Sequence, residues 1–145
     1  MRCIMDITDL KIIEAMQQNG RISMKNLAHL VSLSPPATAE RVRRLEENGI
    51  IQRYKAIINS DKVGKPIRVF INVAMKSDKL SEFIAFAEKT EAITECHHVT
   101  GPYSMILKAH LREMSELEVL VGKVQVFGNT ETHIIMSSPI ENKPL

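Results

Sequence analysis

The chain has 145 residues, 44% of them hydrophobic and 25% charged, a balance typical of a soluble protein with one domain or two small ones. No apolar run approaches the ~20 residues that span a bilayer, and no signal peptide is visible at the start, so we expect a cytoplasmic protein without membrane contact. The two cysteines lack a CxxC spacing, and we expect both thiols to be reduced. Residues 1–65 carry a net charge of +4 and residues 66–145 a net charge of −2, which predicts that only the front half contacts a polyanion.

The first two predicted helices form the start of the chain. Asp6 is suited to cap a helix over residues 6–18. Ser23 caps a shorter second helix, which ends at a tight turn, Ser32-Leu33. A short helix followed by a tight turn is the first half of a helix-turn-helix.

The sequence specifies both ends of a third helix. Ser34 is a favourable N-cap, and Pro35 takes the first helical position, where a missing N–H costs nothing. Gly49 can adopt the left-handed conformation after the last turn, and Ile50 then reaches back to Leu45, as in a Schellman motif. In a helix-turn-helix this second helix of the motif enters the major groove, and its N-terminal residues meet the bases.

The outward face of the third helix is predicted to contact DNA. Ala39, Val42 and Leu45 repeat every three residues and are expected to face inward, which leaves Thr38, Arg41 and Arg44 outward. Thr38 and Arg41 are expected to contact bases, and the remaining cations to contact phosphates. The alternative is a solvated face on which the arginines pair with Glu40, Glu46 and Glu47. The full set of expected DNA-binding residues is Ser34, Thr38, Arg41, Arg43, Arg44, Arg53 and Lys55.

Residues 51–58 alternate in a pattern typical of a strand, and residues 59–61 form a turn. Arg53 and Lys55 would face solvent on this strand, as the wing beside the third helix. A short hinge, Val63-Gly64-Lys65-Pro66, follows. We therefore expect a DNA-binding domain over residues 1–64 and a second domain over residues 65–145.

Several short motifs of the front half occur in a fixed order. They are Asp6-x-x-Asp9-x-x-Ile12-Ile13, Gly20-Arg21-Ile22-Ser23, Leu27-Ala28, Leu33-Ser34, Arg41-Val42-x-Arg44-Leu45-Glu46 and Gly49-Ile50-Ile51. No single motif is specific, but the ordered set resembles the leucine-responsive regulatory protein/AsnC (feast/famine) family, and the resemblance covers nearly the whole chain. It implies a homo-oligomeric, sequence-preferring transcription regulator that binds double-stranded DNA and is associated with the nucleoid.

The second domain is predicted to be ferredoxin-like. Strands are expected at residues 67–75, 93–100, 103–110 and 130–137, with a helix capped by Ser77 after the first strand and a helix over residues 114–124 before the last. This β-α-β-β-α-β order places two helices on one face of a sheet and leaves the other face in need of a partner. The predicted fold class is therefore α+β, a winged helix-turn-helix followed by a ferredoxin-like (RAM-type) domain.

The resemblance also implies how the second domain works. Members of the family form dimers that assemble further, commonly into octamers, and bind small effectors, usually amino acids, between dimers. Ser104 stands where the family usually has Asp, and it keeps a hydrogen bond without the charge that suits an ammonium group. The alternative is that the loop around Gly101 and Ser104 is only a hairpin turn in an oligomer contact. By position, the effector would contact Thr100, Gly101, Tyr103, Ser104, Thr132, Ile134 and Met136.

One cluster, Cys96, His97, His98 and His133, is suited to metal binding or catalysis. On a strand Cys96 and His98 face one way and His97 the other, so adjacent residues do not chelate together. We therefore expect histidines at a sheet surface or a subunit contact, and no catalytic residue, metal or cofactor.

Two alternatives to the regulator remain. One is an architectural protein that bends or wraps DNA with little sequence preference. The other is an enzyme like the haem-precursor decarboxylases, which share this two-module architecture and work through histidines.

Overall fold

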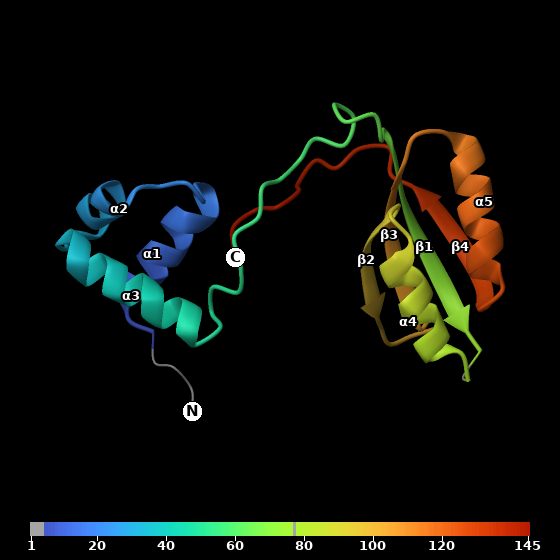
Figure 1. Cartoon of the computed structure of the whole chain (residues 1–145), viewed down its shortest axis with the longest axis horizontal. Helices are drawn as coiled ribbons and strands as arrows, with labels where there is room; N and C mark the ends of the chain where they lie inside the picture. Colours follow the sequence, from blue (N-terminus) through green and yellow to red (C-terminus); the bar gives the residue numbers. More distant parts are fainter. Residues whose placement is uncertain (1–4, 77) are drawn as a thin grey trace. The chain divides into compact units, whose positions relative to one another are not determined.

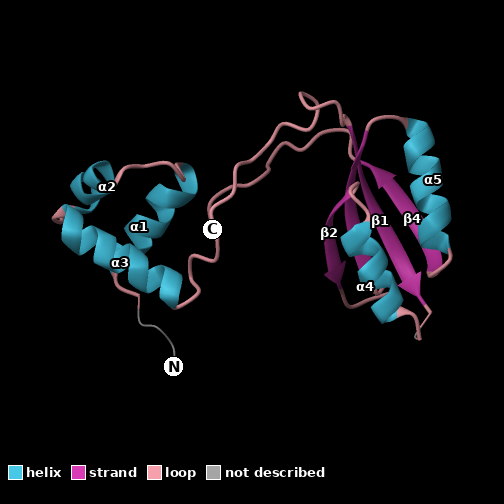
Figure 2. Cartoon of the chain, viewed as in Figure 1, coloured by secondary structure: helices cyan, strands magenta, loops and turns pink. Residues whose placement is uncertain are grey.

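The computed structural model describes residues 5–76 and 78–145 (Figure 1). Contacts divide the described chain into two units, residues 5–57 with 140–145, and residues 58–139. The first unit is helical and the second contains the sheet (Figure 2). The predicted boundary after Gly64 lies further along the chain than the division of the structure, because a turn closed by Lys65 N–H to Ser60 O at 2.8 Å joins these residues to the start of the sheet.

The helical unit contains α1 (Ile7–Gln18), α2 (Met24–Val31) and α3 (Pro35–Glu47). The predicted caps of the first two helices are confirmed. The Asp6 carboxylate accepts a hydrogen bond from Asp9 N–H at 2.8 Å, and Asp9 accepts one from Asp6 N–H at 3.2 Å, which completes a capping box. The Ser23 hydroxyl accepts a hydrogen bond from Asn26 N–H at 3.1 Å.

A small aliphatic core holds the three helices together. Its buried members are Ile12, Leu27, Val31, Val42 and Leu45. Each such side chain contributes about 1.5–3 kcal/mol when it leaves water. This core orients α3 relative to α1 and α2 and determines which of its residues remain on the surface.

The predicted strand over residues 51–58 is wrong. In the part of the chain that the structure describes, this segment is extended but belongs to no sheet. Alternation indicates which side chains can be buried, but a strand also requires a second backbone to satisfy its N–H and C=O groups. The Tyr54 hydroxyl instead donates a hydrogen bond to Glu46 of α3 at 2.6 Å, which attaches the segment to the end of that helix.

The second unit contains an antiparallel sheet in the order β2-β3-β1-β4. The prediction of a ferredoxin-like β-α-β-β-α-β fold is confirmed. The first strand has the predicted bounds, whereas the hairpin strands are shorter, and the last strand begins earlier and ends before Met136. The strands are β1 (Ile67–Met75), β2 (Ile93–His98), β3 (Met105–Leu111) and β4 (Gly128–Ile134).

Two helices, α4 (Leu80–Lys89) and α5 (Met114–Gln125), cover one face of this sheet (Figure 1). The core includes Phe83 of α4, whose ring packs edge-on against Phe127 at a centroid distance of 5.3 Å. The predicted cap Ser77 lies outside the described residues, and the N-cap position is Lys79. No helix among the described residues is long and apolar enough to cross a membrane.

Candidate functional sites

Both predicted ends of α3 are confirmed. The Ser34 hydroxyl accepts a hydrogen bond from Ala37 N–H at 3.3 Å, and Pro35 occupies the first helical position. At the other end Gly49 has a φ of 69°, and Ile50 N–H donates to Leu45 O at 2.9 Å. These are the bonds of a Schellman motif, so the helix that is expected to meet DNA has a defined start and stop.

The predicted inward and outward faces of α3 are partly wrong. Thr38, expected outward, is fully buried, and its hydroxyl donates to Ser34 O at 3.0 Å, whereas Ala39, expected inward, is exposed. Steps of three residues turn less than a full circle, so a 39–42–45 series drifts around the helix. The series Thr38, Val42, Leu45 combines steps of four and three and stays on one stripe. The Thr38 side chain is therefore not on the outer surface of α3.

Arg41, also expected outward, binds the start of α1. Its Nη1 lies 2.7 Å from Asp6 Oδ2 and 2.8 Å from Asp9 Oδ1, and its side chain is only 26% exposed. The hydrogen bonds that Arg41 donates to Asp6 and then to Asp9 raise the pKa of Arg41. The pKa of Asp6 is lowered, first by the Asp9 amide and then by Arg41. Arg41 therefore couples α3 to α1 instead of extending toward a base.

The other predicted cations are on the surface. Arg43 pairs with Glu40 at 2.6 Å and with Glu47, which agrees with the alternative of a solvated, ion-paired face at that position. The hydrogen bonds that Arg43 donates to Glu40 are the main cause of the raised pKa of Arg43. Arg44 is exposed and forms no ion pair with the residues that the structure describes. Among the arginines of α3, Arg44 is therefore the one whose charge stays available to a phosphate.

Arg53 and Lys55 lie on either side of Tyr54, in the extended segment after α3, and both are exposed. Burial, followed by the hydrogen bond to Glu46, raises the pKa of Tyr54 to about 12. The tyrosine therefore stays protonated and keeps its hydrogen bond. This contact holds the two cations next to the C-terminal end of α3.

The loop at residues 99–104, which contains the predicted effector residues Thr100, Gly101, Tyr103 and Ser104, forms the turn of the β2–β3 hairpin. Gly101 has a φ of 116°, a conformation that favours glycine. The Ser104 hydroxyl accepts a hydrogen bond from Met75 N–H at 3.0 Å, and Ser104 N–H donates to Val73 O at 3.0 Å. Ser104 is thus bound to the end of β1, and its hydroxyl already has a structural partner.

The other predicted effector residues lie on the edge strand β4 and after it. Thr132 pairs with Ile71 and Ile134 with Val69, so both are on the helix-covered face, whereas Met136 lies beyond the strand and is 94% exposed. The structure brings a different β4 residue to the hairpin, because the Tyr103 hydroxyl donates a hydrogen bond to Glu131. This bond raises the pKa of Tyr103. Sequence reasoning did not name Glu131, although it lies next to Thr132 on the last predicted strand.

The histidines are distributed as the strand pattern predicts. Cys96 and His98 pair with Leu107 and Met105 of the helix-covered face, while His97 pairs with Ile106 on the open face. His133 of β4 is also on the open face, 3.2 Å from Glu131. Among the described residues, no three His, Cys, Asp or Glu side chains gather in a way that could hold a metal ion.

The helices and sheet together define a class of protein, a helix-turn-helix DNA-binding domain joined to a ferredoxin-like domain. Two family models match: winged helix-turn-helix DNA-binding over residues 5–52, and Lrp/AsnC ligand binding domain over residues 68–145. The chain is 34% identical over 139 residues to the leucine-responsive regulatory protein of Haemophilus influenzae, covering 91% of this chain and 84% of that protein. The chain belongs to the Lrp/AsnC family of DNA-binding transcription regulators.

Solved structures agree with this assignment. The structure of Bacillus subtilis LrpC matches with a TM-score of 0.91 and 30% identity, covering 97% of this chain and all of LrpC. The transcriptional regulator NMB0573 of Neisseria meningitidis, solved as a complex with L-Met, matches with a TM-score of 0.92 and 25% identity, covering 98% of this chain and 96% of that chain. Both matches extend over the helical head and the sheet.

Proposed function

We propose that this chain is a cytoplasmic, nucleoid-associated homo-oligomer that prefers particular DNA sequences and changes its DNA binding when an amino acid binds its second domain. The observation that carries the proposal is α3, a helix with both ends capped that presents an exposed N-terminal turn and the exposed Arg44, which has no ion-pair partner among the described residues. Its N-terminus offers free N–H groups and a partial positive charge to a phosphate. In a dimer, two copies of α3 would enter major grooves one helical turn, about 34 Å, apart.

The burial of Thr38 and the ion pairs of Arg41 change the proposed DNA contacts. The N-terminal turn of α3, from Ser34 to the exposed Ala37, would face the bases. Arg44 would bind phosphate, together with Arg53 and Lys55 of the extended segment. Arg43 would join them only after exchanging Glu40 and Glu47 for phosphate oxygens.

Self-association is proposed to use the open face of the sheet. Phe70 of β1 is 39% exposed there and pairs with Lys108 of β3 and His133 of β4. An exposed aromatic ring at the centre of a sheet, surrounded by polar and charged groups, is typical of a subunit interface. Dimers formed in this way would assemble further, toward the octamer that the family resemblance implies.

The amino-acid site is proposed at the β2–β3 hairpin, where a second copy would complete it. The Lrp/AsnC ligand-binding match and the L-Met complex of the Neisseria neighbour support an amino acid as the effector. Glu131, held at the hairpin by Tyr103, would supply the negative charge that Ser104 lacks. The ammonium group of the effector would then replace the Tyr103 hydroxyl or share the carboxylate with it.

Fluorescence anisotropy with the gene's own upstream DNA and a scrambled duplex of equal length, at several salt concentrations, tests the regulator. We expect steep salt dependence and tighter binding to the upstream DNA. Arg44→Ala should weaken binding to both duplexes, while Lys11→Ala, an exposed cation of α1, should not. Equal affinity for both duplexes would favour the architectural protein, and absence of binding at low salt would overturn the proposal.

The effector is tested in the same assay with L-methionine as the probe. We expect methionine to change the affinity for the upstream DNA, and Glu131→Gln to remove this response without changing DNA binding in its absence. A response that persists in Glu131→Gln would remove Glu131 from the site. No response to methionine or to a mixture of the other amino acids would favour the alternative in which the hairpin is only an oligomer contact.

A further inference from the structure

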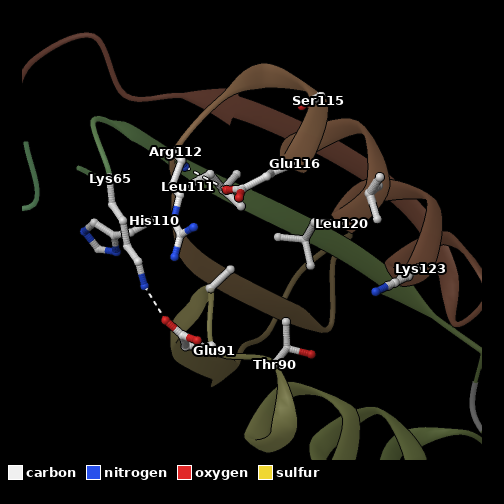
Figure 3. A pocket seen from close by; sticks show the side chains of 12 residues that line it. Lys65, Thr90, Glu91, His110, Leu111, Arg112, Ser115, Glu116, Leu120 and Lys123 are labelled. Carbon is white, nitrogen blue, oxygen red and sulfur yellow. Dashed lines mark hydrogen bonds and ion pairs between the residues drawn. The ribbon is translucent and has the colours of Figure 1, made fainter. Parts of the chain in front are cut away.

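A cavity of about 410 Å³ lies in the second unit, on the helix-covered face of the sheet (Figure 3). It is located where β1 begins and β3 ends, since its lining includes Lys65 and Leu111. The β2–β3 hairpin lies at the other end of these strands, where Val73 pairs with Met105. The cavity is therefore separate from the proposed amino-acid site, and its size is in the range of small-molecule sites, roughly 300–1,000 Å³.

The floor and one wall of the cavity are aliphatic. Leu111 and Leu120 are buried beneath it, Ala92 is half-buried, and Val119 of α5 remains 57% exposed. Among the described residues that line it, there is no Phe, Tyr or Trp, and the one imidazole is that of His110. A flexible hydrocarbon chain would cover this surface and remove Val119 from water, with a gain of about 25 cal/mol per Å² of apolar area.

Some of the charged residues around the cavity have ion-pair or hydrogen-bond partners, and others do not. Lys65 and Glu91 pair with each other at 2.7 Å, and this pair lowers the pKa of Glu91. The Glu116 carboxylate accepts a hydrogen bond from the backbone N–H of Arg112 at 2.8 Å. Both carboxylates that line the cavity therefore have partners within the domain.

Two cations remain available. Neither the Arg112 guanidinium nor the Lys123 ammonium forms an ion pair with a residue that the structure describes, although the charge of Arg112 contributes, after Lys65, to the lowered pKa of Glu91. Figure 3 shows them on opposite sides of Leu120, with the aliphatic floor between them. An anionic group would gain charge-assisted hydrogen bonds from either cation, whereas an ammonium group would be repelled by both.

We infer that this cavity binds a small aliphatic carboxylate, a molecule with one anionic head and an uncharged hydrocarbon tail, and that it disfavours zwitterionic amino acids. The head contacts Arg112 or Lys123, and the tail lies on Leu111, Leu120 and Val119. The inference goes beyond the proposed function, because it assigns a second ligand class to a second place in the domain. It requires neither DNA binding nor the hairpin site.

Isothermal titration calorimetry of the full chain without DNA tests the inference, with octanoate as the probe. We expect saturable binding of octanoate, and at least tenfold weaker binding of 1-octanol, which lacks the charge, and of octylamine, which reverses it. Arg112→Gln and Lys123→Gln should each weaken octanoate binding, the more important of the two by about tenfold, the effect of losing one charge-assisted contact. Lys76→Gln, an exposed lysine at the other end of β1, is the matched control and should leave the affinity unchanged.

A second pair of variants tests the place of binding. Val119→Phe should fill the cavity and abolish octanoate binding, whereas Val126→Phe, at a valine of similar exposure (59% against 57%) outside the cavity, should not. Both positions are exposed, so neither change disturbs the core. Octanoate affinity that survives Val119→Phe, equal binding of octylamine, or no binding of octanoate would each overturn the inference. The methionine response of the DNA complex is a separate readout, so either proposal can fail alone.

Discussion

The guanidinium of Arg41 in α3 lies 2.8 Å from the carboxylate of Asp9 in α1, which is 5% exposed, and 2.7 Å from Asp6, the cap of the same helix. The capping box that starts α1 therefore also anchors α3. Without Arg41, the nearly buried Asp9 carboxylate would keep only the hydrogen bond from Asp6 N–H, and its charge would have no counter-ion. The position of α3 thus depends on an ion pair between residues 32 and 35 positions apart in the sequence.

We expect Arg41→Ala to loosen α3 and not to change base preference directly. Deuterium uptake of peptides from α1 and α3 should rise, and the urea midpoint of the helical unit should fall. Arg43→Ala is the matched control, because its pairs with Glu40 and Glu47 are exposed and contribute little. Unchanged uptake in Arg41→Ala, with altered preference among DNA sequences, would return Arg41 to the role of a base contact.

Acid should weaken the same junction. The pKa of Asp6 is lowered from its ordinary value of 3.8, first by the Asp9 amide and then by Arg41. A depressed pKa in the folded state contributes stability that is present above the ordinary value and is lost as the pH falls through the lowered one. Asp6→Asn keeps a capping side chain but cannot ionise, so the urea midpoint should depend less steeply on pH below about 4 than in the wild type. Equal slopes below this pH would show that Asp6 does not contribute.

The substitution Thr38→Val should show whether the Thr38 hydroxyl stabilises the fold or contacts DNA. The change keeps the shape of the side chain and removes the hydrogen bond to Ser34 O, so we expect the free energy of unfolding to fall by about 0.5–1.5 kcal/mol. The ratio of affinities for the upstream and scrambled duplexes should stay the same. A changed ratio in the anisotropy assay would place Thr38 at the DNA after all.

Two glycines of the second unit should respond in opposite directions to alanine. A Cβ at Gly128 would overlap the carbonyl oxygen of Ala74 on β1, so Gly128→Ala should separate β4 from β1 at a cost of about 1–3 kcal/mol. Gly122 is in α5 with nothing within 4 Å of the added atom, and Gly122→Ala should stabilise by about 0.5–1 kcal/mol. Thermal unfolding checks both signs, and a stable Gly128→Ala would refute the close strand approach.

Charge on the open sheet face should dissociate the oligomer. Phe70→Glu places a carboxylate at the centre of the proposed interface, where it would have to be desolvated. Ile84→Glu, on α4, is the control because its exposure is similar, 41% against 39%. Sedimentation velocity should show a smaller species for Phe70→Glu alone. The same species for both variants and the wild type would place the interface elsewhere.

Local signals in the sequence predicted the ends of the first three helices well. Ser23, Ser34 and Gly49 act within a few residues of themselves, so their cap and turn chemistry depends little on the rest of the fold. The alternation of β1 was equally informative, because a sheet covered on one face buries every second residue. These signals were sufficient for the three helices of the first unit, for the order of elements in the second and for the fold class.

Surface assignments on α3 were less predictable, because they depend on what packs against the helix. The sequence placed Arg41 on the predicted outward face, and only the arrangement of α1 beside α3 shows that two carboxylates occupy its guanidinium. The extended segment at residues 51–58 had the pattern of a strand but no neighbouring strand in the described chain. Glu131 reached the hairpin through the register of β4 on β1, which alternation alone does not specify.

The sequence by itself determined the caps, the turns, the apolar periodicities and, through the order of its motifs, the Lrp/AsnC family. The tertiary structure decided which polar groups are already occupied, Arg41 by Asp6 and Asp9 and Ser104 by the end of β1, and which, such as Arg44, remain available. The physical reason is the range of the interactions. Caps and periodicities act between residues a few positions apart, whereas an ion pair or a cavity joins residues that only the packed fold brings together.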